Sequence, residues 1–177
     1  MSAYSGLYGR LVILVLSFSL VGCGFQLRSY GFEGNIESVA ITGMTRAEVV
    51  GPLRQNLRRS QVPEKSVSEA DLVVEILDQR NRRRSASTTG GAGAAEYEVD
   101  YSVQYQILNS DGEVIAEPTW IERQRTFTID RGNIVGSNQE QTLLRREILD
   151  DAAGQIVRAL SLVSRAQQDK AEASDAG

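Results

Sequence analysis

The chain has 177 residues, with 19 Lys and Arg, 23 Asp and Glu and no histidine, which gives a net charge of −4. The lack of histidine excludes Ser-His and Cys-His catalytic pairs and imidazole metal sites, so we expect neither an enzyme nor a metal or other cofactor. The negative charge disfavours nucleic acid as a partner.

The first 22 residues are typical of a bacterial lipoprotein signal. Arg10 precedes the uncharged run Leu11–Leu20, which is too short to span a bilayer, because spanning takes roughly 20 residues. The run ends in Leu20-Val21-Gly22-Cys23, which resembles a lipobox, where the cysteine is lipidated and becomes the first residue. We predict a signal peptide over residues 1–22, lipidation at Cys23 and a membrane-anchored tether over residues 23–35. The alternative is that Cys23 is merely a small apolar residue of a signal or helix.

A strand and a helix are predicted to follow the tether. The strand covers Ile36–Thr42, where apolar residues recur. Thr45 and Glu48 have the spacing of a capping box, which favours a helix directly after them. Pro52 conflicts with that start, since a proline inside a helix costs about 3 kcal/mol. The helix therefore begins near Gly51 or is kinked at Pro52, and the sequence leaves both possibilities open.

Three strands come next. Residues 72–77 form an apolar run that continues as an arginine-rich arm to residue 87, and a Gly/Ala turn covers residues 88–95. From Tyr97 to Ile107 apolar and polar residues alternate, which predicts a strand with one buried and one solvated face. A hairpin turn at residues 109–112 contains Asp-Gly and leads to a strand from about residue 114 to 129. Pro118 predicts a break or bulge within this last strand.

The final element is a long amphipathic helix. Ser137 and Glu140 have capping-box spacing and are predicted to open it. We expect the helix to end near Arg165 and residues 166–177 to be a disordered tail. The predicted fold class is α+β: residues 36–165 form a single domain, a two-layer sandwich with two helices packed on one face of a four-stranded, mostly antiparallel sheet.

At this point the sequence resembles the LptE family of lipopolysaccharide-assembly lipoproteins. The resemblance rests on the mature start, on the opening of the alternating strand and on the last helix: Gly22-Cys23-Gly24-Phe25-x-Leu27-Arg28, Ala95-Glu96-Tyr97 and Asp151-Ala152-Ala153-x-Gln155-Ile156-x-Arg158-x-Leu160. It implies a body that plugs the LptD outer-membrane β-barrel, assists its assembly, binds lipopolysaccharide and helps deliver it to the cell surface. Gly24 after the anchor cysteine favours sorting to the outer membrane, with the body on the periplasmic side.

A lipopolysaccharide-binding region is predicted around the densest basic stretch. Lipopolysaccharide is phosphorylated, and Arg82, Arg83 and Arg84 could contact its phosphates together with Arg131. Members of the family resembled have a basic residue in the turn before Ala-Glu-Tyr and another just before the last helix. This chain has no positive charge at the corresponding Gly90–Ala94 and Gly136–Asn138, so Arg82–Arg84 and Arg131 would supply the charge instead. The competing interpretation is that the arginines form an ordinary solvated strand end that protects a sheet edge from aggregation.

Two other functions stay open at the level of sequence. One is a periplasm-facing adaptor lipoprotein of a lipid-transporting ABC system, which would use a similar α+β body. The other is a lipoprotein hydrolase, which the missing histidine and the lack of a nucleophile motif disfavour. The glycines at residues 90–93 are not followed by Lys-Ser/Thr and so do not form a P-loop.

Overall fold

The computed structural model describes residues 36–87, 94–130 and 132–175, all within one compact unit. The predicted signal peptide, Cys23 and the tether lie outside the described residues. The elements follow the order β1 (Val39–Gly43), α2 (Val50–Arg59), β2 (Leu72–Ser87), β3 (Ala94–Asn109), β4 (Val114–Asp130) and α3 (Ile134–Asp175). None of the described helices has the length and apolar character needed to span a membrane.

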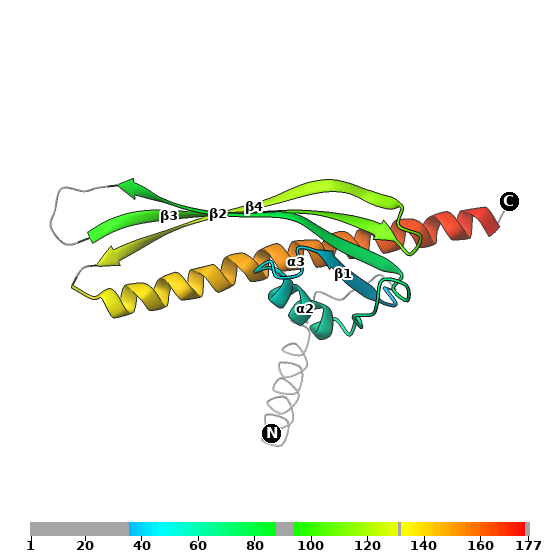
Figure 1. Cartoon of the computed structure of the whole chain (residues 1–177), viewed down its shortest axis with the longest axis horizontal. Helices are drawn as coiled ribbons and strands as arrows, with labels where there is room; N and C mark the ends of the chain where they lie inside the picture. The colour runs from blue at the N-terminus through cyan, green and yellow to red at the C-terminus, as the bar shows by residue number, and fades with distance from the viewer. Residues whose placement is uncertain (1–35, 88–93, 131, 176–177) are drawn as a thin grey trace, which may run out of the picture. The chain divides into compact units, whose positions relative to one another are not determined.

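The sheet has the order β1-β2-β3-β4, with β1 parallel to β2 and the other pairs antiparallel. Both helices lie on the same side of it (Figure 1), where α3 packs mainly on β4 and α2 packs on α3. The predicted α+β sandwich with a mostly antiparallel sheet is therefore confirmed. Because β1 pairs only with Leu72–Ile76, the sheet is four strands wide at one end and three strands wide along the arginine-rich part of β2.

The alternation in β3 decides which side of the sheet is covered. Tyr101, Val103, Tyr105 and Ile107 are buried beneath the helices, while the residues between them face the open side. We call these two sides the helix-facing side and the outer side. Fully burying a side chain such as leucine contributes about 1.5–3 kcal/mol, so this row of large side chains is a main source of stability.

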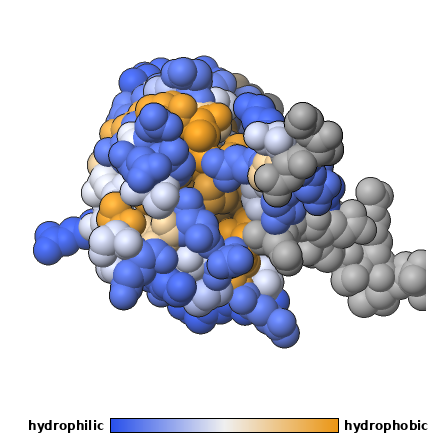
Figure 2. Space-filling view, turned by 90° about the vertical axis from the view of Figure 1, so that its right-hand side faces the viewer, coloured by the Kyte–Doolittle hydropathy of each residue, from blue (hydrophilic) through white to orange (hydrophobic). Residues whose placement is uncertain are grey.

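The core is concentrated at the wide end of the sheet. Besides the buried row of β3, its side chains come from β1, α2, the first half of β2, β4 and the middle of α3 and include Val39, Leu53, Val74 and Ile156. At the end of the body seen on the right of Figure 1, hydrophobic side chains lie between hydrophilic ones that cover the outside (Figure 2).

The start of α2 shows how Pro52 is accommodated. The helix begins at Val50, so Pro52 is in the first turn, where backbone N–H groups have no helical partner in any case. The predicted capping box is wrong, because the cap position is Val49, which makes no side-chain hydrogen bond. Glu48 instead binds Arg145 of α3.

The capping box predicted for α3 is also wrong. The helix starts at Ile134, and its cap is Asn133, whose Oδ1 accepts a hydrogen bond from the Gly136 N–H at 3.1 Å. The Ser137 hydroxyl accepts from the Asp130 N–H at 3.0 Å and donates to the Asn133 carbonyl at 3.1 Å, so it links the end of β4 to the start of α3. At its other end the helix continues to Asp175, whereas we expected a disordered tail from residue 166.

Four register shifts interrupt the pairing of the long strands, two between β2 and β3 and two between β3 and β4. The register of β2 against β3 shifts between Ile76 and Asp78. On β4, the residues opposite Tyr105 and Ile107 are Thr119 and Ala116, so one extra residue bulges out around Pro118, as predicted. The hairpin turn is also as predicted: Gly112 has a positive φ and donates a hydrogen bond from its N–H to the Asn109 carbonyl at 3.1 Å.

Candidate functional site

The arginine run of β2 is divided between the two sides of the sheet. Arg82 pairs in register with Asp100 and Arg84 with Glu98, so both arginines are on the outer side. Arg83 pairs with Val99 and is on the helix-facing side. Neighbouring residues of a strand point to opposite faces, and the three arginines therefore do not form one cluster.

Arg84 is neutralised by carboxylates. Its Nε contacts Glu98 and lies 3.5 Å from Asp100, and Glu98 also accepts a hydrogen bond from Gln124 of β4. The hydrogen bond to Glu98 and the charges of Asp100 and Glu98 raise the pKa of Arg84 above its usual value. Both contacts are made by the Nε, and the two carboxylates compensate the charge of Arg84, which weakens its attraction for an anionic ligand.

Arg83 is held by aromatic rings instead. Its guanidinium carbon lies 4.3 Å from the centroid of the Tyr97 ring and 5.8 Å from that of Phe127. The two rings stack with centroids 5.8 Å apart and an angle of 25° between their planes. Within the described part of the chain, neither Arg83 nor Arg82 forms an ion pair.

A second arginine–aromatic contact lies on the outer side. The guanidinium carbon of Arg80 is 4.3 Å from the ring centroid of Trp120 on β4, and its Nη2 forms an ion pair with Asp78 at 2.9 Å. The sequence alone does not single out Trp120 as a candidate site residue. Its contact with Arg80 depends on the register of β2, β3 and β4, which sequence alone does not give.

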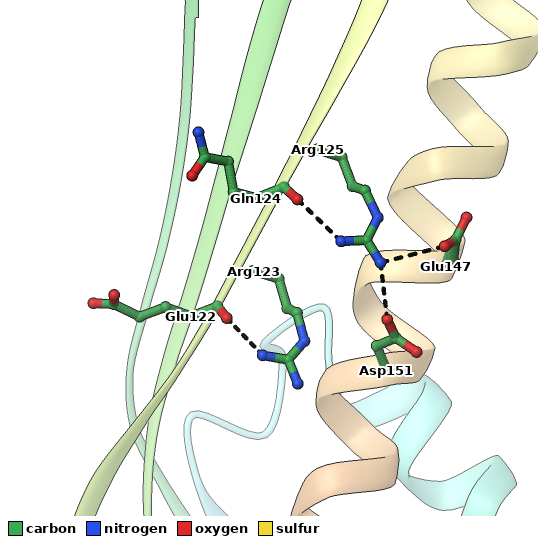
Figure 3. Close-up of polar contacts among 6 residues, drawn as sticks. All are labelled: Glu122, Arg123, Gln124, Arg125, Glu147 and Asp151. Carbon is green, nitrogen blue, oxygen red and sulfur yellow. Dashed lines mark hydrogen bonds and ion pairs between the residues drawn. The ribbon is translucent and has the colours of Figure 1, made fainter.

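The arginines of β4 point toward α3 (Figure 3). Arg125 Nη2 lies 3.3 Å from Glu147 and 3.2 Å from Asp151, one turn apart on the helix, and Nη1 donates to the Gln124 carbonyl at 3.0 Å. Arg123 donates to the Glu122 carbonyl at 2.7 Å. Arg125 is opposite Val99 in the register, as is Arg83, so both belong to the helix-facing side. Arg125 links the sheet to α3.

Two of the predicted site residues cannot be placed. Arg131 and Cys23 both lie outside the described residues, as do residues 88–93 of the predicted Gly/Ala turn. The strands beside this turn are described, and the register pairs Ala94 with Asp130. The start of β3 and the end of β4 thus lie side by side.

A network of hydrogen bonds and one ion pair connects β2, β3 and α3 with the segment that precedes α2. Gln79 Oε1 accepts hydrogen bonds from the Glu48 N–H at 2.8 Å and from the Tyr101 hydroxyl at 3.1 Å. The carboxylate of Glu48 in turn binds Arg145 of α3, with one contact at 3.0 Å. Burial, with a smaller contribution from the charge of Glu48, raises the pKa of Tyr101 above its usual value, and burial does the same for Tyr105.

Because the pKa values of both tyrosines are raised, we expect the folded protein to lose stability at high pH. In the unfolded chain tyrosine titrates near pH 10, while the folded protein holds both protons more tightly. Their contribution is therefore complete below about pH 10 and declines as the pH rises further. We expect the urea midpoint to be constant from about pH 8 to 9 and to fall above about pH 10. Tyr101→Phe should make this fall shallower, and an unchanged slope would contradict the assignment.

A small cleft separates α3 from the sheet beside Phe127. It is lined mainly by apolar side chains and by two arginines that are already paired: Val99, Arg125, Phe127, Gln141, Leu144, Arg145 and Ile148. Its volume of about 20 Å³ suits about one water molecule. It offers no preformed space for an acyl chain. No group of three or more His, Cys, Asp and Glu that could hold a metal ion occurs among the described residues.

The fold defines the class to which this protein belongs, that of small α+β bodies with helices on one side of a four-stranded sheet. It matches the solution structure of lipoprotein B from Nitrosomonas europaea with a TM-score of 0.68, over 83% of this chain and 96% of that one at 20% identity. Rare lipoprotein B from Shewanella oneidensis matches with a TM-score of 0.58, over 74% and 98% of the chains at 21% identity. At these identities the likeness concerns the fold alone.

The family follows from sequence. The profile of LptE, described as lipopolysaccharide-assembly, matches residues 36–160, and the chain belongs to this family. The LPS-assembly lipoprotein LptE of Photorhabdus laumondii is 27% identical over 95% of this chain and 94% of its own length. The protein of the same name from Pectobacterium atrosepticum is 28% identical over 91% and 90%. The resemblance noted in the sequence is thereby confirmed.

Proposed function

We propose that this protein is a lipid-anchored outer-membrane lipoprotein that acts in lipopolysaccharide assembly as the partner of an LptD-like β-barrel. The family match carries the proposal, because it covers most of the folded body, residues 36–160, and not merely a lipobox. The finer points belong to the proposal as well: lipidation at Cys23, a plug-like complex that assists assembly of the barrel, a periplasmic position and direct binding of lipopolysaccharide.

The polar outer side of the sheet supports the proposal that the partner is a barrel with a polar inner wall. Between Glu96 and Gln104 of β3, and between Trp120 and Thr128 of β4, the outward residues carry carboxylates, amides and hydroxyls, apart from Trp120 beneath Arg80. They are Glu96, Glu98, Asp100, Ser102, Gln104, Glu122, Gln124, Thr126 and Thr128. The lumen of an outer-membrane barrel is polar and hydrated, so such a surface can lie against it with its polar groups satisfied.

A pull-down from the native outer membrane tests the proposal. The tagged, lipidated protein is extracted in mild detergent, and we expect a one-to-one complex with a large barrel protein that survives washing. Recovery with inner-membrane transporter subunits would instead support the adaptor function, and recovery of the lipoprotein alone would contradict the complex.

The variant Cys23→Ala tests whether lipidation at Cys23 anchors the protein in the membrane. One acyl chain gives only marginal membrane binding, and stable anchoring takes two signals. Without the thiol no lipid can be attached, so we expect the variant to be lost from the outer-membrane fraction almost completely. Mass spectrometry of the mature N-terminus gives an independent measurement. An unlipidated Cys23 in the native protein would contradict the anchor.

A further inference from the structure

The sheet ends in a long strand that has a neighbouring strand on one side only. β4 (Val114–Asp130) is last in the order β1-β2-β3-β4, so among the described residues β3 alone pairs with it. The unpaired N–H and C=O groups of such an edge can bind the edge of another chain, which produces dimers or aggregates. Pro118 interrupts the edge, because proline has no N–H to donate. Glu122 and Gln124 are exposed, so α3 leaves the middle of the edge open to solvent.

Two arginines of β4 bind backbone carbonyls of their own strand in this open part. Arg123 Nη1 donates to the Glu122 carbonyl at 2.7 Å, and Arg125 Nη1 donates to the Gln124 carbonyl at 3.0 Å. Figure 3 shows both carbonyl oxygens pointing away from the neighbouring strand and toward the arginines. Because the pleat repeats every two residues, the carbonyls of residues 122 and 124 belong to the same edge of the strand. Two successive acceptors of the open edge are therefore occupied.

A guanidinium in this position takes the place of an added strand. Neighbouring strands lie about 4.8 Å apart, and a strand carbonyl accepts an N–H from the next strand at about 2.9 Å. The guanidinium nitrogens already stand at this distance from the Glu122 and Gln124 oxygens. Arg125 is held there by Glu147 and Asp151 of α3, so it cannot swing away without breaking two ion pairs.

We propose that Arg123 and Arg125 cap the β4 edge and thereby prevent two copies of this chain from joining their sheets. The excluded occupant is a second copy, because an antiparallel pair of identical strands is self-complementary about a two-fold axis. Such a pair would also bring the positive side chains of both copies close together, and their repulsion disfavours it further. The inference concerns the edge of the sheet and is independent of the proposed function.

The oligomeric state of edge variants tests the proposal. The purified full-length lipidated protein in detergent is analysed by size-exclusion chromatography with light scattering, which gives the protein mass of each complex. The wild type should be a monomer at micromolar concentrations. In the double variant Arg123→Ala/Arg125→Ala the protein mass should double, because the edge carbonyls are free to accept a second strand. The control Arg58→Ala/Arg146→Ala removes two exposed arginines from the helices and should stay monomeric.

Three further variants separate edge pairing from other causes of association. Adding Gln124→Pro to the double variant should restore the monomer, because it removes an N–H of the edge without removing a bond to β3. Glu147→Gln/Asp151→Asn breaks the ion pairs of Arg125 but keeps both arginines, and it should stay monomeric. Arg123→Ala alone keeps those ion pairs and should dimerise at higher concentration than the double variant.

Three outcomes would overturn the assignment. The first is that the double variant and Arg123→Ala both remain monomeric at every concentration measured. The second is that Gln124→Pro leaves the dimer intact, because association would then use another surface. The third is that Glu147→Gln/Asp151→Asn dimerises as strongly as the double variant, because loosening of α3 would then explain the association.

Discussion

Gly43→Ala is expected to lower the free energy of unfolding by about 3 kcal/mol. Gly43 ends β1 with φ of +72°, a conformation that residues with a Cβ rarely adopt. A Cβ at this position would also overlap the backbone carbonyl oxygen of Ile76. That oxygen cannot move freely, because it accepts the Met44 N–H at 2.8 Å, the bond that turns the chain away from the sheet.

Substitutions at two other glycines separate the cost of the positive φ from the cost of the overlap with Ile76. Gly112 has φ of +83° but open space around it, so Gly112→Ala should cost only the backbone strain, about 1 kcal/mol. Gly51 lies in the first turn of α2 with ordinary φ and open space, and Gly51→Ala should stabilise the protein by about 0.5 kcal/mol. Urea unfolding of the three variants gives the order directly. Equal effects at Gly43 and Gly112 would show that the overlap with Ile76 is relieved.

The alternation of β3 is the part of the fold that sequence predicts best. Apolar and polar residues differ strongly in the free energy of burial, so a period of two over Tyr97–Ile107 allows only one arrangement on a sheet that is covered on one side. The buried side chains of Tyr101, Val103, Tyr105 and Ile107 follow from it. The break at Pro118 is predicted equally well, because proline cannot donate to the ladder.

The capping boxes fail because a short polar motif has several possible partners. Ser137 and Glu48 each have the right spacing for a cap, yet their side chains bind Asp130 and Arg145, which the fold brings near. Helices in proteins owe most of their stability to packing, so a helix can start where its buried face begins rather than where a cap motif occurs. The better signal for α3 is Asn133, an N-cap residue that the sequence also contains.

The predicted lipopolysaccharide-binding region, too, could be predicted from the sequence only in part. The strand period applied to Arg82, Arg83 and Arg84 is enough to place Arg83 alone on one side of the sheet. The neutralisation of Arg84 is different, because it requires Glu98 to be opposite Arg84 in register and Asp100 to be opposite Arg82. This register is fixed by the bulges and the hairpin turn together. Lipidation at Cys23 and the role of Arg131 stay predictions from sequence.

Phe127→Ala is expected to detach the first part of α3 from the sheet. Phe127 is the buried large side chain of the last part of β4, and with Val99, Leu144 and Ile148 it forms the apolar contact beneath the start of the helix. Replacing a buried phenylalanine by alanine costs about 3–5 kcal/mol. Because the core is concentrated at the other end of the sheet, this loss should appear as local opening rather than as global unfolding.

Hydrogen exchange followed by mass spectrometry measures this difference. In Phe127→Ala, amides of α3 from about residue 138 to 147 should lose protection, while β1 and the paired part of β2 keep theirs. The matched variant is Leu53→Ala, which removes a fully buried side chain from α2 in the main core. It should lower protection in all elements together, because that core holds β1, α2, β2 and α3 in one cooperative unit.

Uniform loss of protection in Phe127→Ala would show that the narrow end of the sheet and the main core unfold as one. In that case Arg125 and the Glu48–Arg145 pair, which join α3 to the rest of the body, couple the two ends more strongly than their exposed positions suggest.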